Sequence, residues 1–348
     1  MGTKPNMGTQ LNFDMFRYVY DHLAAIKKCD NLDLFLYTGG GNTLVPHRLT
    51  LLIREYCSKF SVIVPFLAAS AGTLLCLGAN EIVMGKNGSL SPIDPTTSNE
   101  FNPINPRDKN KVIPISVEDV SSFLALAKDK ALIRGEDKTL EVFKDLTGSR
   151  EMAIHPLALG NVYRALRLIR DIAKKQLLLH VDNKEKIQRI VKPLTELLYS
   201  HQYLIDRQEL KRMELNVVDS ETVPHLDETI WNLYKMYEEE IKMLEPFNPH
   251  DIISRQPAPP QQAMIPPNLN VQMPQGANVQ HIQQVINQIQ NQLTPPPVSV
   301  PFSNYAAFIE STKLTHGYKF DGKITENRKP DGTKEISVEM KGYWERIR

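Results

Sequence analysis

The fold is decided by a stretch that begins LDLFLYTGGG at residues 32–41. Its apolar part, Leu32 to Tyr37, is typical of a buried strand in a parallel sheet. The three glycines that follow predict a backbone that turns tightly. Residues 43–59 then carry apolar side chains at helical spacing, and a second apolar run, FSVIVP, occupies residues 60–65. This order predicts one βαβ unit.

The second strand leads into AASAGT at residues 68–73, which opens a short apolar helix, LLCL, at residues 74–77. A third strand, EIVM at residues 81–84, and a turn-rich segment, SPIDP at residues 91–95, complete the stretch. Ser70 is therefore expected at a strand-to-helix turn, where the unpaired N–H groups of a helix start point outward. The glycine turn follows a neighbouring strand, so it is expected at the same end of the sheet.

This layout permits acyl transfer. A tetrahedral oxyanion needs two N–H donors, and Ala71 together with Gly40 or Gly41 can supply them. The alternative is that Ser70 only caps a helix beside a packing turn, because Ser-Ala-Gly by itself is a weak motif. The local pattern leaves both interpretations open.

Taken together, these pieces resemble the serine dehydrogenase proteinase family, a branch of the Clp protease/crotonase superfamily related to signal peptide peptidase. The resemblance rests on the order and spacing of four segments, and it extends over residues 11–220. The family usually has Pro-Gly-Gly in the first turn, whereas this chain has Gly39 in place of the proline. The resemblance implies an α/β fold of the Clp/crotonase type, a ββα superhelix with a helical extension. The four segments are residues 33–41, 64–73, 81–84 and 91–95.

The resemblance also implies a catalytic triad in the chain order Ser, Asp, His, which falls on Ser70, Asp94 and His201. Taken alone, an aspartate before a proline is typical of a turn, and His201 is typical of a cap at a helix C-terminus. His155 is the reserve base, and its structural alternative is a residue just outside the helix that Pro156 opens.

A lysine base is a further alternative, because signal peptide peptidases pair their serine with a lysine on a later helix. Lys128 lies at a comparable position, on a helix predicted from residue 116 to about residue 133. A lysine must be desolvated to lose its proton near neutral pH. The neighbours of Lys128 give no sign of deep burial, so a solvated lysine is the favoured interpretation.

The function that follows from the resemblance is hydrolysis of peptide bonds in a peptide or protein substrate, without a metal or cofactor. Members of this superfamily usually assemble into rings or stacked trimers, so a homo-oligomer is expected. Two alternatives belong to other classes. One is a crotonase-like acyl-CoA enzyme, and the other is a non-catalytic assembly protein that keeps the fold.

The composition divides the chain into four parts. Residues 1–10 are expected to be a loose tail, and residues 11–245 the protease domain. Within that domain, residues 11–28 are expected to form an amphipathic helix and residues 96–114 a long loop. Residues 246–301, rich in Pro, Gln and Asn, are expected to be a disordered linker with one short helix at residues 279–293. Residues 302–348 alternate like a β-hairpin that Trp344 anchors.

Charge, cysteine usage and hydropathy argue against a nucleic-acid-binding, a disulfide-stabilised or a membrane-spanning protein. The formal net charge of the 348 residues is +1, which implies no general affinity for nucleic acid. The three cysteines are spread along the chain and are expected to be reduced buried thiols. No run approaches the roughly 20 apolar residues that a membrane-spanning helix needs. We therefore expect a soluble, cytoplasmic protein with no integral membrane segment.

Overall fold

The computed structural model describes residues 3–4, 7–129, 135–148, 154–197, 200, 202–255, 297–328 and 333–348. The chain forms two compact units. The first is built on Thr9–Tyr237 with Ser311–Lys313, and the second on Thr3–Gly8, Glu238–Glu310 and Leu314–Arg348. The division therefore falls near residue 237, inside a helix, rather than at the expected residue 245.

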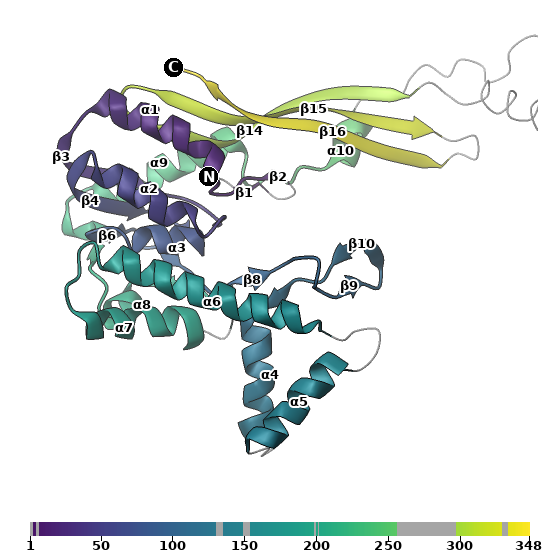
Figure 1. Cartoon of the computed structure of the whole chain (residues 1–348). Helices are drawn as coiled ribbons and strands as arrows, with labels where there is room; N and C mark the ends of the chain where they lie inside the picture. Colours follow the sequence, from purple (N-terminus) through teal and green to yellow (C-terminus); the bar gives the residue numbers. More distant parts are fainter. Residues whose placement is uncertain are drawn as a thin grey trace, which may run out of the picture. The chain divides into compact units, whose positions relative to one another are not determined.

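A parallel four-stranded sheet forms the centre of the first unit, with the strand order β13-β6-β4-β3. Val62 of the central strand pairs with Leu34 on one side and with Ile82 on the other, and it is fully buried. Helices cover this sheet, which confirms the predicted α/β class (Figure 1). The strands are β3 (Cys29–Phe35), β4 (Cys57–Val64), β6 (Glu81–Met84) and β13 (Val217–Asp219).

A second, smaller sheet is formed by the segments that follow the strands of the first sheet. Its order is β12-β7-β5, and Thr38 adds a single parallel bridge to Ala68. After β3 the chain reaches Thr38, and after β4 it forms β5, so in both cases it passes through the second sheet before the next helix begins. After β6 it likewise enters the second sheet, as β7. The short strands are β5 (Leu67–Ala68), β7 (Ser89–Leu90) and β12 (Ile205–Asp206).

A buried side-chain amide on α6, the longest helix of the first unit, joins three of its helices. Gln176 is fully buried, and its side-chain N–H groups donate to Thr50 and to the Leu74 carbonyl, both at 2.9 Å. This contact fixes α6 against α2 and α3, the helix that follows Ser70. The helices are α1 (Phe16–Ile26), α2 (Val45–Arg54), α3 (Ala71–Cys76), α4 (Val117–Asp129), α5 (Glu136–Gly148), α6 (Pro156–Leu177), α7 (Lys184–Lys192), α8 (Arg207–Arg212) and α9 (Leu226–Ile241).

Two predicted helices are shorter than expected. The helix predicted at residues 43–59 ends at Arg54, because Cys57 already pairs with Cys29 as the first residue of β4. The helix predicted from residue 11 begins only at Phe16, after a 3₁₀ turn at Phe13–Met15. Leu11 instead forms a parallel bridge with Gly41, the last glycine of the predicted tight turn.

The loop predicted at residues 96–114 contains short strands. β9 (Ile104–Asn105) pairs with β10 (Asp108–Val112), and β8 (Thr96–Thr97) pairs with β11 (Ile115–Ser116). The buried side chain of Asn102 donates to the carbonyls of Thr97 and Ile113, both at 2.9 Å. Three of these strands, β8, β9 and β11, have only two residues, which is too short to leave a period-2 pattern in the sequence.

The second unit contains a three-stranded antiparallel sheet in the order β14-β15-β16, so the predicted two-stranded hairpin was wrong. Pro301 and the composition of the preceding segment hid the first strand. Met7, predicted to lie in a loose tail, packs in the core of this unit with Phe247, Ile253 and Ile324. The elements are β14 (Val298–Glu310), β15 (Thr315–Arg328), β16 (Lys334–Arg346), α10 (Pro249–Ser254), β1 (Thr3–Lys4) and β2 (Met7–Gly8).

Most of the expected linker, with the short helix predicted at residues 279–293, lies outside the described residues. Its two described ends are ordered, contrary to the expectation, since α10 covers Pro249–Ser254 and β14 begins at Val298. The disorder expected of the rest stays a prediction. Trp344, the expected anchor, lies on β16 with its ring edge-on to Tyr318, at 5.2 Å between ring centroids. This contact is internal to the sheet.

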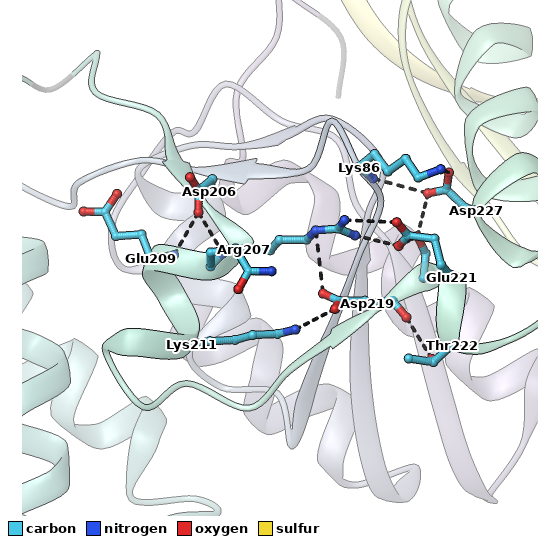
Figure 2. A network of polar contacts seen from close by, with 11 residues as sticks. Lys86, Asp206, Arg207, Glu209, Lys211, Asp219, Glu221, Thr222 and Asp227 are labelled. Atoms are coloured by element: carbon cyan, nitrogen blue, oxygen red, sulfur yellow. Dashed lines mark hydrogen bonds and ion pairs between the residues drawn. The ribbon is translucent and has the colours of Figure 1, made fainter.

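An ionic network fastens β12 and α8 to the chain that follows β13 (Figure 2). The Arg207 guanidinium donates to both carboxylate oxygens of Glu221, at 2.6 and 3.0 Å. Asp219 accepts from Lys211 at 2.7 Å. Asp227 accepts from the Ser220 hydroxyl and from the backbone N–H of Lys86, in the turn between β6 and β7. The network therefore ties that turn to the segment that carries β12.

This network predicts acid sensitivity. The hydrogen bonds from Arg207 lower the pKa of Glu221 from its ordinary 4.5 to about 2. A lowered folded-state pKa contributes stability that is present above about pH 4.5 and is lost as the pH falls toward 2. Glu221→Gln should therefore flatten the dependence of the melting temperature on pH between pH 5 and pH 2, most clearly at low salt.

The exposed Glu228 lies outside the network, so Glu228→Gln is the matched control and should leave the curve unchanged. An equal response of both variants would show that the Arg207–Glu221 pair adds nothing to stability.

Candidate active site

Ser70 lies between β5 and α3 in a backbone conformation that side chains rarely adopt. Its φ is 51° and its ψ is −107°. For a residue with a Cβ atom this conformation is strained, and such strain is found at functional sites more often than elsewhere. A serine on a sharp, strained strand-to-helix turn also characterises the nucleophile of α/β-hydrolases. The predicted turn is therefore present, with a strain that the sequence did not reveal.

Two buried hydroxyl residues hold the Ser70 backbone in place. The Ser70 N–H donates to Ser91 Oγ at 2.8 Å, and the Ser70 carbonyl accepts from the Leu74 N–H at 3.0 Å. Thr73 Oγ1 lies 2.9 Å from the Ala68 carbonyl and 2.8 Å from the Ser91 carbonyl, and it accepts from the Ser91 N–H at 3.2 Å. Both side chains are almost fully buried. Ser91 and Thr73 thus link both sides of the strained turn to the segment after β7.

The glycine turn lies directly against Ser70. The Thr38 N–H donates to the Leu67 carbonyl and the Thr38 carbonyl accepts from the Ala69 N–H, both at 3.0 Å. Gly40 has a φ of 109°, and a Cβ atom placed there would lie 3.1 Å from the Ser70 Cβ and 3.6 Å from the Ala71 nitrogen. This approach needs glycine, so the turn and the start of α3 meet as the sequence predicted.

The N–H groups of this region differ in whether they are already used. The Gly40 N–H donates to Thr38 Oγ1 at 3.1 Å. Within the described part of the chain, the N–H groups of Gly41 and Ala71 have no acceptor. Leu11 fixes Gly41, because its N–H donates to the Gly40 carbonyl and its carbonyl accepts from the Asn42 N–H, both at 2.9 Å. Of the three expected oxyanion donors, Gly41 and Ala71 are the two that remain available.

The other expected site residues lie in different environments. Asp94 is buried, with 2% of its surface exposed, and it lies three residues after Ser91 in the chain. His201 lies outside the described residues. The exposed His155 caps α6, accepting from the Leu157 N–H at 3.2 Å, and it stacks on Phe101.

Lys128, the expected lysine alternative, is exposed on the last turn of α4. A lysine base must be desolvated, so this exposed environment does not suit one. The structure therefore brings Ser70 together with the two glycines and Ala71, and it gives His155 a structural role as a helix cap.

Cavities lie at both ends of the strands of the parallel sheet. One of about 240 Å³ opens at the carboxyl ends of β4 and β6 and includes Pro65, Gly85 and Trp231 in its lining. A larger one, of about 540 Å³, lies at the amino ends of β6 and β13 beside His180 and Lys186. The larger cavity lies at the amino ends of the strands, whereas the Ser70 turn follows their carboxyl ends. Backbone geometry rather than cavity size therefore locates the candidate site.

Within the described ranges, no group of three or more His, Cys, Asp or Glu side chains could hold a metal ion. The same part of the chain contains no helix with the length and apolarity needed to cross a membrane. All three cysteines are free thiols, as expected, and burial raises the pKa of Cys76 well above its usual range, so Cys76 is not a nucleophile.

Comparison with known proteins agrees with this geometry. Residues 18–158 match the family of ClpP-like SDH-type serine proteinases, the family that the sequence motifs resemble. The match ends before the second unit and before residue 201.

Two uncharacterized proteins of Methanocaldococcus jannaschii are similar to this chain. One is 25% identical over 206 residues, which is 59% of this chain and 56% of the relative. The other is 26% identical over 213 residues, which is 61% of this chain and 62% of the relative. The chain thus spans less than two thirds of the length of either relative, and neither relative has a described activity.

Sequence reasoning missed the residues that hold Ser70 in place. Ser91 belongs to the SPIDP segment, but only Asp94 of that segment was singled out. Thr38 and Thr73 flank the glycine turn and the serine turn, and both were treated as neighbours of a turn. Small hydroxyl residues beside such turns are a usable signal, because they hydrogen-bond to nearby backbone groups.

Ser91→Ala should loosen the Ser70 turn. The variant leaves the part-buried Ser70 N–H without its acceptor, which costs about 1–3 kcal/mol. We expect the melting temperature to fall by several degrees, with faster amide hydrogen exchange at Ser70. Ser89→Ala is the control, because the Ser89 hydroxyl has no hydrogen-bond partner among the described residues. Equal exchange rates in both variants would show that Ser91 does not hold the turn.

Proposed function

We propose that this protein is a serine peptidase in which Ser70 is the nucleophile. The observation that carries the proposal is the strained Ser70 turn, against which Gly40 packs. Among the described residues, the N–H groups of the neighbouring Ala71 and of Gly41, next to Gly40, are unused. Oriented N–H groups stabilise the oxyanion of acyl transfer, and removing one such donor typically costs about a hundredfold to a thousandfold in rate. The match of residues 18–158 to a serine proteinase family supports the same conclusion.

The base in this proposal is His201, with Asp94 as its orienting carboxylate. The support comes from the two contacts that bracket the segment carrying His201. Before it, the Leu194 carbonyl accepts from the Ile93 N–H at 3.0 Å. After it, Ile205 of β12 pairs antiparallel with Leu90 of β7. Both ends of the segment are therefore anchored beside residues 90–94.

The mechanism follows from these roles. Ser70 Oγ attacks the peptide carbonyl while His201 accepts its proton, and Asp94 stabilises the charged imidazole. The oxyanion forms against the Gly41 and Ala71 N–H groups. His201 then returns the proton to the leaving amine, and water hydrolyses the acyl-enzyme by the same steps. No metal or cofactor is required.

The repeated passage of the chain from the large sheet into the small sheet supports the finer fold assignment, a ββα superhelix of the Clp/crotonase type. We propose peptide or protein substrates and a homo-oligomeric assembly. A crotonase-like acyl-CoA enzyme would also use two N–H donors, but it does not need a hydroxyl on the strained turn. A non-catalytic assembly protein would not need the strain at all.

A fluorophosphonate probe should label Ser70, because the turn combines a nucleophile with donors for the phosphoryl oxygen. Ser70→Ala should abolish both labelling and peptidase activity and leave the melting temperature within a few degrees of the parent. The measurement is mass spectrometric mapping of the modified residue, with Ser89→Ala as a control that keeps full labelling. Labelling at another residue, or unchanged peptide cleavage by Ser70→Ala, would end the serine peptidase proposal.

His201→Ala should lower the turnover number by several powers of ten, as loss of a triad member does. His155→Ala should cost less than tenfold, since His155 caps α6 and stacks on Phe101. Lys128→Ala should have no effect, because its side chain is exposed. The turnover numbers of the three variants on one fluorogenic peptide test this ranking. A larger loss with His155→Ala than with His201→Ala would show that His155 is the general base.

A further inference from the structure

The outer edge of β16 is long, regular and exposed. β16 pairs with β15 over thirteen consecutive residues without a bulge, from Lys334 to Arg346. Among the described strands it has no partner on its other side. Every side chain from Ser337 to Lys341 is exposed, including Val338 at 37% and Met340 at 52%. An edge strand presents unpaired N–H and C=O groups, which pair with a further strand unless they are blocked.

The opposite edge of the sheet is blocked, and this contrast makes β16 distinctive. β14 contains Pro301, which has no N–H to donate, and its pairing with β15 is interrupted between Tyr305 and Ala307. Proline and bulges are devices that protect an edge from pairing. β16 has neither device, and its only protection is its charged side chains.

The side chains of β16 separate into an apolar and a polar face. Val338 is paired with Ile324, which is fully buried, so the two residues share a face. Ile336 and Met340, two residues to either side, lie on this face as well. Glu335, Ser337, Glu339 and Lys341 lie on the other face.

We propose that two copies of this chain associate through antiparallel pairing of their β16 edges, with the two-fold axis at Val338. This register places Val338 opposite Val338 and Ile336 opposite Met340, so the apolar faces of the two sheets become continuous. On the polar face, Glu335 lies opposite Lys341 twice, and Ser337 lies opposite Glu339. No like charges face each other.

Other antiparallel registers are disfavoured by charge, by face or by overlap. An axis at Ile336 pairs only residues 334–338 of each β16, whereas the axis at Val338 pairs residues 334–342. An axis at Glu339 or at Lys341 places each of these residues opposite itself. An axis at Ser337 places Glu335 opposite Glu339, and an axis at Met340 places Glu335 opposite Glu345. An axis between two residues sets the apolar face of one sheet against the polar face of the other. The register centred on Val338 is the one that the sequence of β16 favours.

Disulfide trapping tests the register directly. Val338→Cys places two thiols on facing residues about 4.5–5.5 Å apart at Cα, within the range for a disulfide. Met340→Cys is the matched control, because its two copies would lie four residues apart along the strands, roughly 13 Å. Mild oxidation followed by a non-reducing gel should show a covalent dimer for Val338→Cys, and none for Met340→Cys or the parent chain. Trapping of Met340→Cys but not Val338→Cys would overturn the register.

Charge reversal tests the contact without cysteines. Glu335→Lys places a second ammonium group opposite Lys341 of the other copy, while within its own sheet this position is paired with the uncharged Asn327. We expect at least tenfold weaker association through this edge by sedimentation equilibrium, restored when Lys341→Glu is added. A parent chain with no association, or a Glu335→Lys variant that associates like the parent, would refute the proposal. Neither the disulfide trapping nor the sedimentation measurement depends on Ser70 chemistry. The dimer proposal is therefore tested independently of the peptidase assignment.

Discussion

The candidate site depends on one constraint, the backbone of Ser70 held at a φ of 51° between β5 and α3. A conformation of this kind costs on the order of 1–3 kcal/mol for a residue with a side chain. The hydrogen bond to Ser91 Oγ and the contacts of the buried Thr73 hydroxyl offset that cost locally. The Ser70 side chain makes no capping hydrogen bond at the start of α3, and within the described part of the chain the Ala71 N–H has no acceptor, so both groups are available to a substrate.

The small second sheet explains how distant parts of the chain meet at this turn. Thr38 brings the glycine turn beside Ala68, and β7 brings Ser91 to the Ser70 N–H. β12 adds the segment that follows His201, and the ionic network around Arg207 fixes β12 in turn. Four segments of the chain therefore converge at the Ser70 turn, mainly through backbone hydrogen bonds.

The sequence allowed prediction of the parallel strands, the two turns and the meeting of those turns, since apolar runs and small residues report directly on burial and close approach. It did not allow prediction of the strain at Ser70 or the roles of Ser91 and Thr73, because hydrogen bonds across the fold leave no periodic signal. β14 was missed because Pro301 and the composition before it resemble a linker. Leu11 was assigned to a helix, although its backbone fixes the glycine turn. Asp94 and His201 came from family resemblance alone.

The most direct test of this account is a crystal structure of the protein after reaction with a fluorophosphonate. The account predicts a covalent bond to Ser70 Oγ, with the phosphoryl oxygen about 2.7–3.1 Å from both the Gly41 and the Ala71 nitrogen. It also predicts that the Ser70 turn keeps its hydrogen bond to Ser91. A phosphoryl oxygen that contacts neither N–H group, or a bond to another residue, would contradict the claim that the strained turn is an active site.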